Sequence, residues 1–173
     1  MTLLERVSGD LAARQVPHAL IGAAAMALHG VSRSTIDHDL LVTDRRVLEF
    51  AFWSFLLEGT SADVRPGSAD DPLAGVVRVT AGTERHVDLV VGRAAWQTAI
   101  IERAVARTRG GQLPVAEAAD LVLLKLYAGG SQDRWDIEQL IGVNAAAARV
   151  VDARATELPR ECQRLWAELR SPS

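Results

Sequence analysis

The segment from position 18 to position 42 most constrains what this chain can fold into. The residues at 18–21 predict a short strand that runs directly into Gly22. The strong helix formers at 23–28 follow, and a polar turn then leads to a second predicted strand at 36–42. A strand, a glycine, a helix and a strand in this order indicate a sheet with helices packed against it.

The rest of the chain extends this pattern. Two strands at 76–80 and 85–91 enclose a glycine-containing turn and predict an antiparallel hairpin. The Gly- and Pro-rich segment 59–72 is expected to be a loop. Helices are predicted at 2–15, 45–58, 94–107, 116–128, 132–141, 144–155 and 158–169. We expect an α+β fold with a small mixed β-sheet flanked by helices. Residues 1–109 would form its core, and 110–173 a C-terminal helical segment packed on that core.

Composition and charge narrow the functional class. Of the 173 residues, 49% are hydrophobic and 24% are charged, which is typical of a globular protein. The net charge of −3 disfavours a broad nucleic-acid-coating surface. There is no signal-peptide pattern and no apolar run of about 18 residues, so we expect no membrane association. A single cysteine, Cys162, fits a reducing compartment, and we expect a cytoplasmic location.

Two aspartates stand close together on the predicted strand at 36–42. Side chains two residues apart point to the same face of a strand, so Asp37 and Asp39 should project side by side. Two such carboxylates repel each other unless a cation lies between them. A hard divalent ion with oxygen ligands, Mg²⁺ or Mn²⁺, would resolve this repulsion. The alternative is that the pair marks only a solvated strand end.

A third carboxylate, Asp88, lies among apolar residues on the predicted strand at 85–91. If this strand lies beside the strand of Asp37 and Asp39, the three carboxylates converge as metal-dependent phosphoryl and nucleotidyl transfer requires. Asp88 would then help to activate the attacking hydroxyl. If the carboxylates do not converge, the protein is better interpreted as an interaction module.

Candidate phosphate-binding groups precede the aspartates. Gly22 stands at the start of a predicted helix, where backbone N–H groups bind anions and a glycine permits close approach. Arg33, Ser34 and Thr35 supply further donors immediately before Asp37. Tight packing of helix on sheet is the other interpretation of Gly22.

Lys125 interrupts an apolar run on a predicted helix. Its stem should be packed, and its ammonium group must then find an anion. A nucleoside triphosphate is one candidate, and an ion pair with Asp133 or Asp136 is the other. Both can hold, in different ligand states.

The remaining polar and aromatic residues carry weaker signals. The four histidines, His18, His29, His38 and His86, share no metal-ligand spacing and are expected to pack or to lie at the surface. Core positions are expected for Trp53, Trp96 and Trp166, whereas Trp135 either packs or stacks on a base. The arginines at 103, 107 and 109 form either a solvated face or a basic patch for RNA.

Several of these motifs together resemble the DNA-polymerase-β-like nucleotidyltransferase superfamily. They are Ile21-Gly22-Ala23-Ala24-Ala25, the turn from Gly30 to Thr35, Ile36-Asp37-His38-Asp39-Leu40 and Val87-Asp88-Leu89. The helical segments 120–128 and 132–137 look like a signature of small prokaryotic AbiEii-type toxin-like members. The likeness covers roughly 18–42, 75–92 and 113–141, about half of the chain.

The resemblance implies a role for each matching residue. Gly22 would be the phosphate-loop glycine, Asp37 and Asp39 metal ligands, and Asp88 the third carboxylate and general base. Lys125 would bind the triphosphate, and Asp133 and Asp136 would orient Lys125 or the acceptor. The sequence departs from the superfamily at Ala23, where a second glycine or a serine is usual. Phosphate contacts would then rest on backbone amides alone.

The resemblance also implies an activity. A nucleoside monophosphate would move from a nucleoside triphosphate to an acceptor hydroxyl on an RNA end, a protein or a small molecule. A toxin role, with an antitoxin as partner, would suit an RNA or protein acceptor. The alternative is a weakly active or inactive protein that keeps the fold to bind a nucleotide or a partner.

Overall fold

The computed structural model describes residues 1–32, 37–54, 56, 59–106 and 113–171. The strands are β1 (His18–Ile21), β2 (His38–Val42), β3 (Thr60–Pro66), β4 (Gly75–Ala81), β5 (Val87–Val91), β6 (Val105–Ala106) and β7 (Pro114–Val115). The α-helices are α1 (Leu3–Ala13), α2 (Gly22–Leu28), α3 (Ala95–Arg103), α4 (Ala118–Ala128), α5 (Ser131–Val143), α6 (Ala147–Arg154) and α7 (Arg160–Arg170). Short 3₁₀ helices are η1 (Arg45–Leu48), η2 (Phe50–Trp53) and η3 (Ala155–Glu157).

Within these residues the strands form one seven-stranded mixed sheet in the order β3-β4-β5-β2-β1-β7-β6. The pairs β2–β5 and β1–β7 are parallel, and the other neighbours are antiparallel. The predicted α+β class with a small mixed sheet and flanking helices is therefore confirmed. The predicted hairpin is also present, as the antiparallel pair β4–β5.

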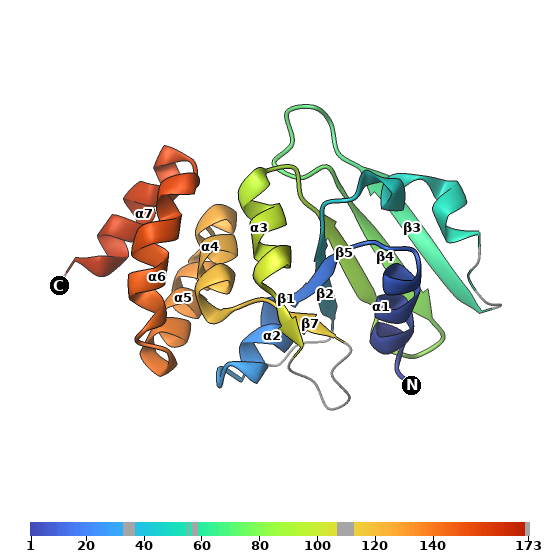
Figure 1. The fold of residues 1–173 in the computed structure, drawn as a ribbon, viewed down its shortest axis with the longest axis horizontal. Helices are drawn as coiled ribbons and strands as arrows, with labels where there is room; N and C mark the ends of the chain where they lie inside the picture. Colours follow the sequence, from blue (N-terminus) through green and yellow to red (C-terminus); the bar gives the residue numbers. More distant parts are fainter. Residues whose placement is uncertain (33–36, 55, 57–58, 107–112, 172–173) are drawn as a thin grey trace.

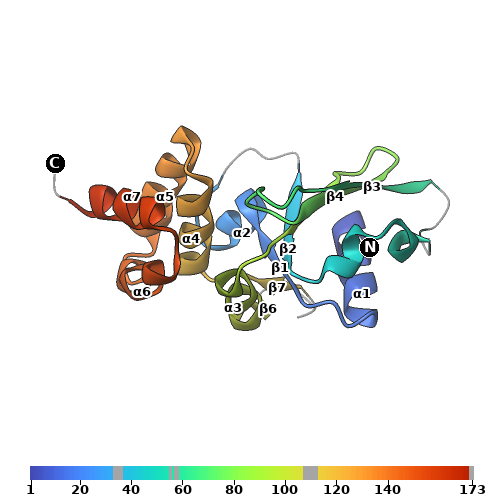
Figure 2. The same ribbon diagram turned by 90° about the horizontal axis from the view of Figure 1, so that it is seen from above.

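The two faces of the sheet differ in chemistry. On β4 and β5 alternate residues are fully buried, among them Val77, Val87 and Leu89. Helices α1 and α3 lie together on one side of the sheet and contact β5 and β2 respectively (Figure 2). The residues between the buried ones, such as Arg78 and Asp88, point to the opposite face, because side chains alternate along a strand. We call this opposite face the open face.

The C-terminal helices form a group at one end of the sheet (Figure 1). Helix α4 contacts α5, α6 and α7, and it also contacts α2. The proposed division at 109/110 falls in a part of the chain outside the described residues and stays a prediction. One strand of the C-terminal part, β7, pairs with β1 and so belongs to the sheet.

A buried carboxylate ties these helices together. Asp120 on α4 is fully buried, and its Oδ1 accepts hydrogen bonds from Arg103 Nη2 on α3 at 2.7 Å and from Arg154 Nη1 on α6 at 2.8 Å. Arg154 Nη1 also donates to Glu117 Oε2 at 2.9 Å. Arg103 is therefore neither a solvated residue nor part of a basic patch, while positions 107 and 109 lie outside the described residues.

Three sequence-based assignments were wrong. The helix predicted at 94–107 ends at Arg103, and Val105–Ala106 form strand β6, which pairs with β7. Segment 59–72 is not a loop throughout, because all seven residues of β3 pair with β4. Its polar composition reflects an edge position with one exposed face, where Asp, Arg and Pro are tolerated. The single helix expected at 45–58 is instead the pair η1 and η2, since Glu49 between them has an extended backbone.

Tryptophan burial matches expectation for Trp53, Trp96 and Trp166, which are all buried. Trp135 has 44% of its surface exposed, so it is not a core residue. None of the helices in the described ranges is long and apolar enough to span a bilayer.

Candidate active site

The register of the central strands sets the aspartates beside one another. In the parallel pair β2–β5, Asp39 lies opposite Asp88. Asp37 and His86 stand two residues before these partners, and the amide of His38 donates to the carbonyl of His86 at 3.1 Å. The two strands therefore begin in register, with Asp37 next to His86. Asp37, Asp39 and Asp88, which the sequence predicted as one group, converge on the open face.

The outer part of this group contains a histidine as well as carboxylates. His86 Nε2 lies 2.8 Å from Asp37 Oδ1 and 3.8 Å from Asp88 Oδ2. Ligand atoms of Asp37, His86 and Asp88 all lie within 4.8 Å of one another, which is compact enough to hold one metal ion. His86 was expected to be a packing or surface residue, and the structure places it in the candidate site.

Asp88 also has a cationic neighbour. Arg78 lies opposite it on β4, and the guanidinium donates to both carboxylate oxygens, at 2.8 and 2.7 Å. These bonds raise the pKa of Arg78 above its ordinary value. A carboxylate offers about four lone-pair sites, so this bidentate pair leaves positions on Asp88 for another ligand. Arg78 thereby fixes the orientation of the Asp88 carboxylate.

Asp39 lies at the inner side of the group, against Gly22. A Cβ atom placed on Gly22 would come within 2.1 Å of Asp39 Oδ2, and Gly22 has a φ of +65°. Both the backbone conformation and the space at this position therefore require glycine. Burial, followed by the charges of Asp88 and Asp37, raises the pKa of Asp39 to about 6. Lys125 and His86 partly offset this rise.

Lys125 projects from α4 toward the same region. Its Nζ lies 2.8 Å from Asp133 Oδ1 and 2.8 Å from Asp136 Oδ2, and Asp136 is fully buried. Burial alone would lower the pKa of Lys125, but the hydrogen bonds with the two aspartates outweigh it and raise that pKa. The lysine therefore stays charged. Of the two sequence interpretations, the ion pair is present in the structure, and triphosphate binding stays a prediction.

A cavity of about 340 Å³ lies between Asp39 and Lys125. Gly22 and Asp39 line it from the sheet side, and Leu121, Leu124 and Lys125 line it from α4. Among the residues of the predicted phosphate site, Ala23 is half-buried in the first turn of α2. Arg33, Ser34 and Thr35 lie outside the described residues.

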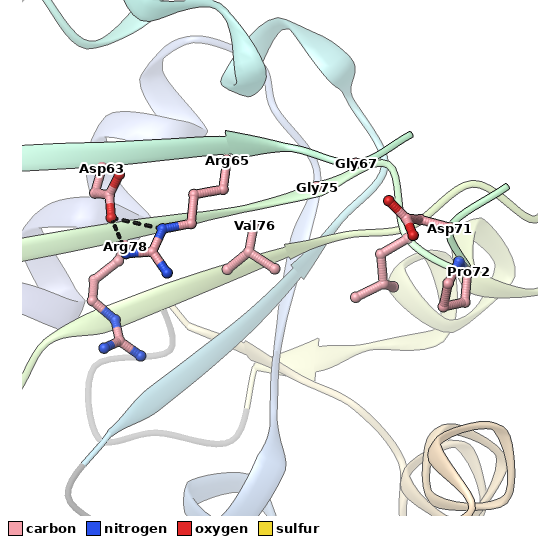
Figure 3. A pocket seen from close by; sticks show the side chains of 9 residues that line it. Asp63, Arg65, Gly67, Asp71, Pro72, Gly75, Val76 and Arg78 are labelled. Carbon is pink, nitrogen blue, oxygen red and sulfur yellow. Dashed lines mark hydrogen bonds and ion pairs between the residues drawn. The ribbon is translucent and has the colours of Figure 1, made fainter. Parts of the chain in front are cut away.

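A second hollow, of about 370 Å³, adjoins the cavity on the open face (Figure 3). Pro72 and Leu73 line both. Arg65, Val76 and Arg78 contribute to its lining from β3 and β4. We call this hollow the β3–β4 groove. Asp39 thus lines the cavity, and Arg78, the partner of Asp88, lines the adjoining groove.

Comparison with known proteins identifies the architecture. No protein-family model and no curated protein matches this chain. A crystal structure of ANT(2")-Ia in complex with adenylyl-2"-tobramycin is 15% identical, covering 90% of this chain and 94% of that chain with a TM-score of 0.56. A solution structure of the antibiotic-resistance factor ANT(2'')-Ia is 17% identical, with coverages of 97% and 89% and a TM-score of 0.51. An antigenic nucleotidyltransferase-like protein from Paracoccidioides brasiliensis is 17% identical, with coverages of 93% and 90% and a TM-score of 0.50. The chain has a nucleotidyltransferase fold.

On this nucleotidyltransferase fold the donor set fits a divalent cation. Ligand atoms of Asp37, Asp88 and His86 lie within 4.8 Å of one another, and Asp39 lies opposite Asp88. Burial, followed by the charges of Asp88 and Asp37, raises the pKa of Asp39, and a divalent ion would offset the repulsion among these carboxylates. Asp37, Asp39 and Asp88 are the residues that would hold it.

Two site residues escaped the sequence analysis. His86-Val87-Asp88 has the same spacing as Asp37-His38-Asp39, so a signal for His86 was present in the chain. Arg78 carried no comparable signal, because only the antiparallel pairing of β4 with β5 brings it opposite Asp88.

Gly22→Ala is expected to lower about 100-fold the rate of any reaction that depends on the Asp39 carboxylate. The new Cβ would displace the Asp39 carboxylate, and a misplacement of about 1 Å in a catalytic constellation can cost about that factor. Steady-state kinetics would measure the loss. Gly82→Ala is the matched control, since Gly82 also has a positive φ, of +50°, but has open space around its Cβ position. Equal activities of the two variants would show that contact with Asp39 is unimportant.

Asp39→Asn is expected to stabilise the ion-free protein in a pH-dependent way. The pKa of Asp39 is raised on folding from 3.8 to about 6, so the folded state binds this proton more tightly than the unfolded state. Stability is therefore lost as pH rises from about 4 to about 6, by about 3 kcal/mol. We expect the variant to raise the free energy of unfolding at pH 7 but scarcely at pH 4.

Urea unfolding in the presence of a chelator would measure this difference. Asp70→Asn, at an exposed position, serves as the control and should show no such pH dependence. A stabilisation by Asp39→Asn that is the same at pH 4 and pH 7 would contradict the assignment.

Proposed function

We propose that the protein is a metal-dependent nucleotidyltransferase, which moves a nucleoside monophosphate from a nucleoside triphosphate to an acceptor hydroxyl. One observation carries the proposal. The in-register parallel pairing of β2 and β5 sets Asp39 beside Asp88, with Asp37 and His86 at the preceding positions. Asp39 of this group lines the cavity, and Arg78, the partner of Asp88, lines the β3–β4 groove, so a reaction between two substrates would have two adjoining sites on a nucleotidyltransferase fold.

Each residue has a role in this mechanism. A bound Mg²⁺ or Mn²⁺ ion, held by Asp37, Asp39 and Asp88, would supply charge compensation for the triphosphate and the departing pyrophosphate. Asp88 accepts the proton of the acceptor hydroxyl as the new phosphate ester forms. Arg78 keeps the Asp88 carboxylate oriented through its two hydrogen bonds.

The nucleoside triphosphate would occupy the cavity beside α4. Gly22 allows close approach of a phosphate to the backbone next to Asp39, and Lys125 brings a positive charge to the same cavity. Asp133 and Asp136 hold that lysine in place, and Asp136 is fully buried behind it. A triphosphate would bind the lysine Nζ while at least one of these carboxylates stays in contact with it.

The acceptor would occupy the β3–β4 groove, and a small molecule suits it best. Both arginines in its lining are already paired with carboxylates, Arg65 with Asp63 and Arg78 with Asp88. A nucleic-acid backbone would need cations that are available for phosphate. ANT(2")-Ia, with the same fold, has been solved in complex with adenylyl-2"-tobramycin, an adenylylated small molecule.

Label transfer tests the proposal. The protein is incubated with each of the four α-³²P-labelled nucleoside triphosphates and Mg²⁺ or Mn²⁺, together with the small-molecule, RNA or protein fraction of a cell extract. We expect release of pyrophosphate and transfer of label to the small-molecule fraction. Transfer that survives both Asp37→Ala and Asp39→Ala would overturn the mechanism. Transfer to RNA or protein would keep the reaction and change the acceptor.

A second candidate function is nucleotide binding without turnover. It is favoured by Ala23, which offers no hydroxyl to a phosphate, and by Arg78, which engages both oxygens of Asp88. Tight binding of a nucleotide by calorimetry, with no label transfer to any fraction, would support this alternative.

The closer likeness to AbiEii-type proteins and a toxin role stay predictions, as does a cytoplasmic location. An antitoxin partner would be expected only with an RNA or protein acceptor. Growth arrest upon expression, relieved by Asp39→Ala, would support the toxin role.

A further inference from the structure

Strands β2 and β5 each have two candidate metal ligands spaced two residues apart, and the four side chains lie on the same face of the sheet. Asp37 lies just before β2 and Asp39 lies on it. His86 and Asp88 have the same positions relative to β5. Because the two strands pair in parallel, Asp39 lies opposite Asp88. The result is a cluster of four side chains, three carboxylates and one imidazole. The general mechanism above uses only the three carboxylates and leaves His86 without a role.

The imidazole is aimed into this group without a satisfied hydrogen bond. His86 Nε2 is buried, and within the described part of the chain it has no hydrogen-bond partner. Its 2.8 Å approach to Asp37 Oδ1 is close in distance but lacks hydrogen-bond geometry. A buried nitrogen without a hydrogen bond costs free energy, and a metal ion shared with Asp37 and Asp88 would satisfy it.

The distances suit a metal ion. With ligands about 2.1 Å from the ion, neighbouring corners of an octahedron lie about 3 Å apart and opposite corners about 4 Å apart. His86 Nε2 lies 2.8 Å from Asp37 Oδ1 and 3.8 Å from Asp88 Oδ2. Insertion of an ion therefore needs only small side-chain rotations.

We propose that His86 is a nitrogen ligand of the metal site, and that the site consequently prefers Mn²⁺ or another first-row transition ion over Mg²⁺. This inference rests on the proposed function. Mg²⁺ is bound mainly through carboxylates, phosphates and water. Imidazole raises affinity for transition ions instead, which bind nitrogen more strongly. His86 is thus a specificity-determining ligand in a group otherwise made of carboxylates.

The test uses Mn²⁺ as the probe on the full chain without nucleotide. Electron paramagnetic resonance of free Mn²⁺ gives stoichiometry and affinity, and competition with Mg²⁺ gives the preference between the ions. Electron spin-echo envelope modulation then reports whether a ¹⁴N nucleus is bound directly to Mn²⁺. His86→Asp replaces the nitrogen by a carboxylate, and His86→Gln is the second variant if His86→Asp fails to fold. His38→Gln is the matched control, since His38 alternates to the other face of β2.

We expect ¹⁴N modulation in the wild-type protein and in His38→Gln, and none in either His86 variant. Loss of even an outer hydrogen-bond partner of a metal ligand costs about 10- to 100-fold in affinity. We therefore expect Mn²⁺ binding to weaken at least about tenfold in His86→Gln. In His86→Asp the preference should move toward Mg²⁺.

Two outcomes would overturn the inference, and they separate it from the proposed function. Bound Mn²⁺ without ¹⁴N modulation, or modulation that persists in the His86 variants, would overturn the role of His86 and leave metal-dependent transfer intact. Absence of bound Mn²⁺, with or without a non-hydrolysable nucleoside triphosphate analogue, would overturn both.

Discussion

Asp88→Asn is expected to lower the rate of nucleotidyl transfer by about 10²- to 10⁴-fold. The amide keeps the shape of the side chain but cannot accept the proton of the acceptor hydroxyl, and general-base catalysis contributes a factor of this size. The amide is also neutral, so it offers a metal ion a weaker ligand. Label transfer under saturating nucleotide would measure kcat, and calorimetry would show whether nucleotide binding persists.

Asp63→Asn is the matched control for this experiment. Asp63 lies opposite Arg78 on β3, in the same cross-strand row as Asp88, and lines the β3–β4 groove beside Arg65 with a half-exposed side chain. Its loss can therefore change the KM for an acceptor in the groove, but at saturating acceptor we expect it to keep kcat within a few-fold of the wild-type value. A kcat for Asp88→Asn close to that of Asp63→Asn would contradict the assignment of Asp88 as the base.

Asp120→Ala is expected to destabilise the protein by about 3 to 5 kcal/mol. The substitution removes the shared partner of Arg103 and Arg154 and leaves two guanidinium groups partly buried without it. Breaking one side of a buried ion pair costs about this much. Thermal unfolding should show a fall in Tm of roughly 6 to 20 °C, at about 2–4 °C per kcal/mol for a protein of this size.

Glu168→Ala provides the comparison for Asp120→Ala. Glu168 also forms an ion pair between helices, with Arg134 at 3.6 Å, but both side chains are about half-exposed or more. An exposed pair contributes about 0–1 kcal/mol, so Tm should scarcely change. Similar Tm values for the two variants would show that the Asp120 network does not hold α3, α4 and α6 together.

Most of the secondary structure was predictable because it depends on local patterns. The strand, glycine and helix at 18–28, the β4–β5 hairpin and the C-terminal helices follow from periodicity and from glycine and proline positions. The edge strand β3 was not predictable. Its residues are polar because one side of it faces solvent, and only pairing with β4 makes the segment a strand.

The candidate site was predictable in part. Asp37, Asp39 and Asp88 stood out because they lie among apolar residues on predicted strands, where carboxylates close together repel each other unless a cation lies between them. His86 shares the spacing but was set aside, because histidine also packs well in ordinary cores. Arg78 could not be identified, since its partner depends on strand register.

Helix α4 contributes one residue to a buried ion-pair network and another to the candidate site. Asp120 and Lys125 are five residues apart, which is about 140° around a helix, so they point in different directions. Asp120 is bound by Arg103 and Arg154, whereas Lys125 lines the cavity with Asp39. The sequence places both residues on one helix, and only the packing of α4 shows which of them reaches the site.

The sequence by itself determined the fold class and the identity of the carboxylates, because both follow from short-range spacing along the chain. The tertiary structure decided which strands are neighbours and in which register. That register sets Asp39 beside Asp88, brings Arg78 and His86 to the same carboxylates, and requires glycine at position 22. The physical reason is that the pairing of parallel strands depends on how both faces of the sheet pack against residues distant in the chain. The local sequence pattern of a strand does not specify its partner or its register.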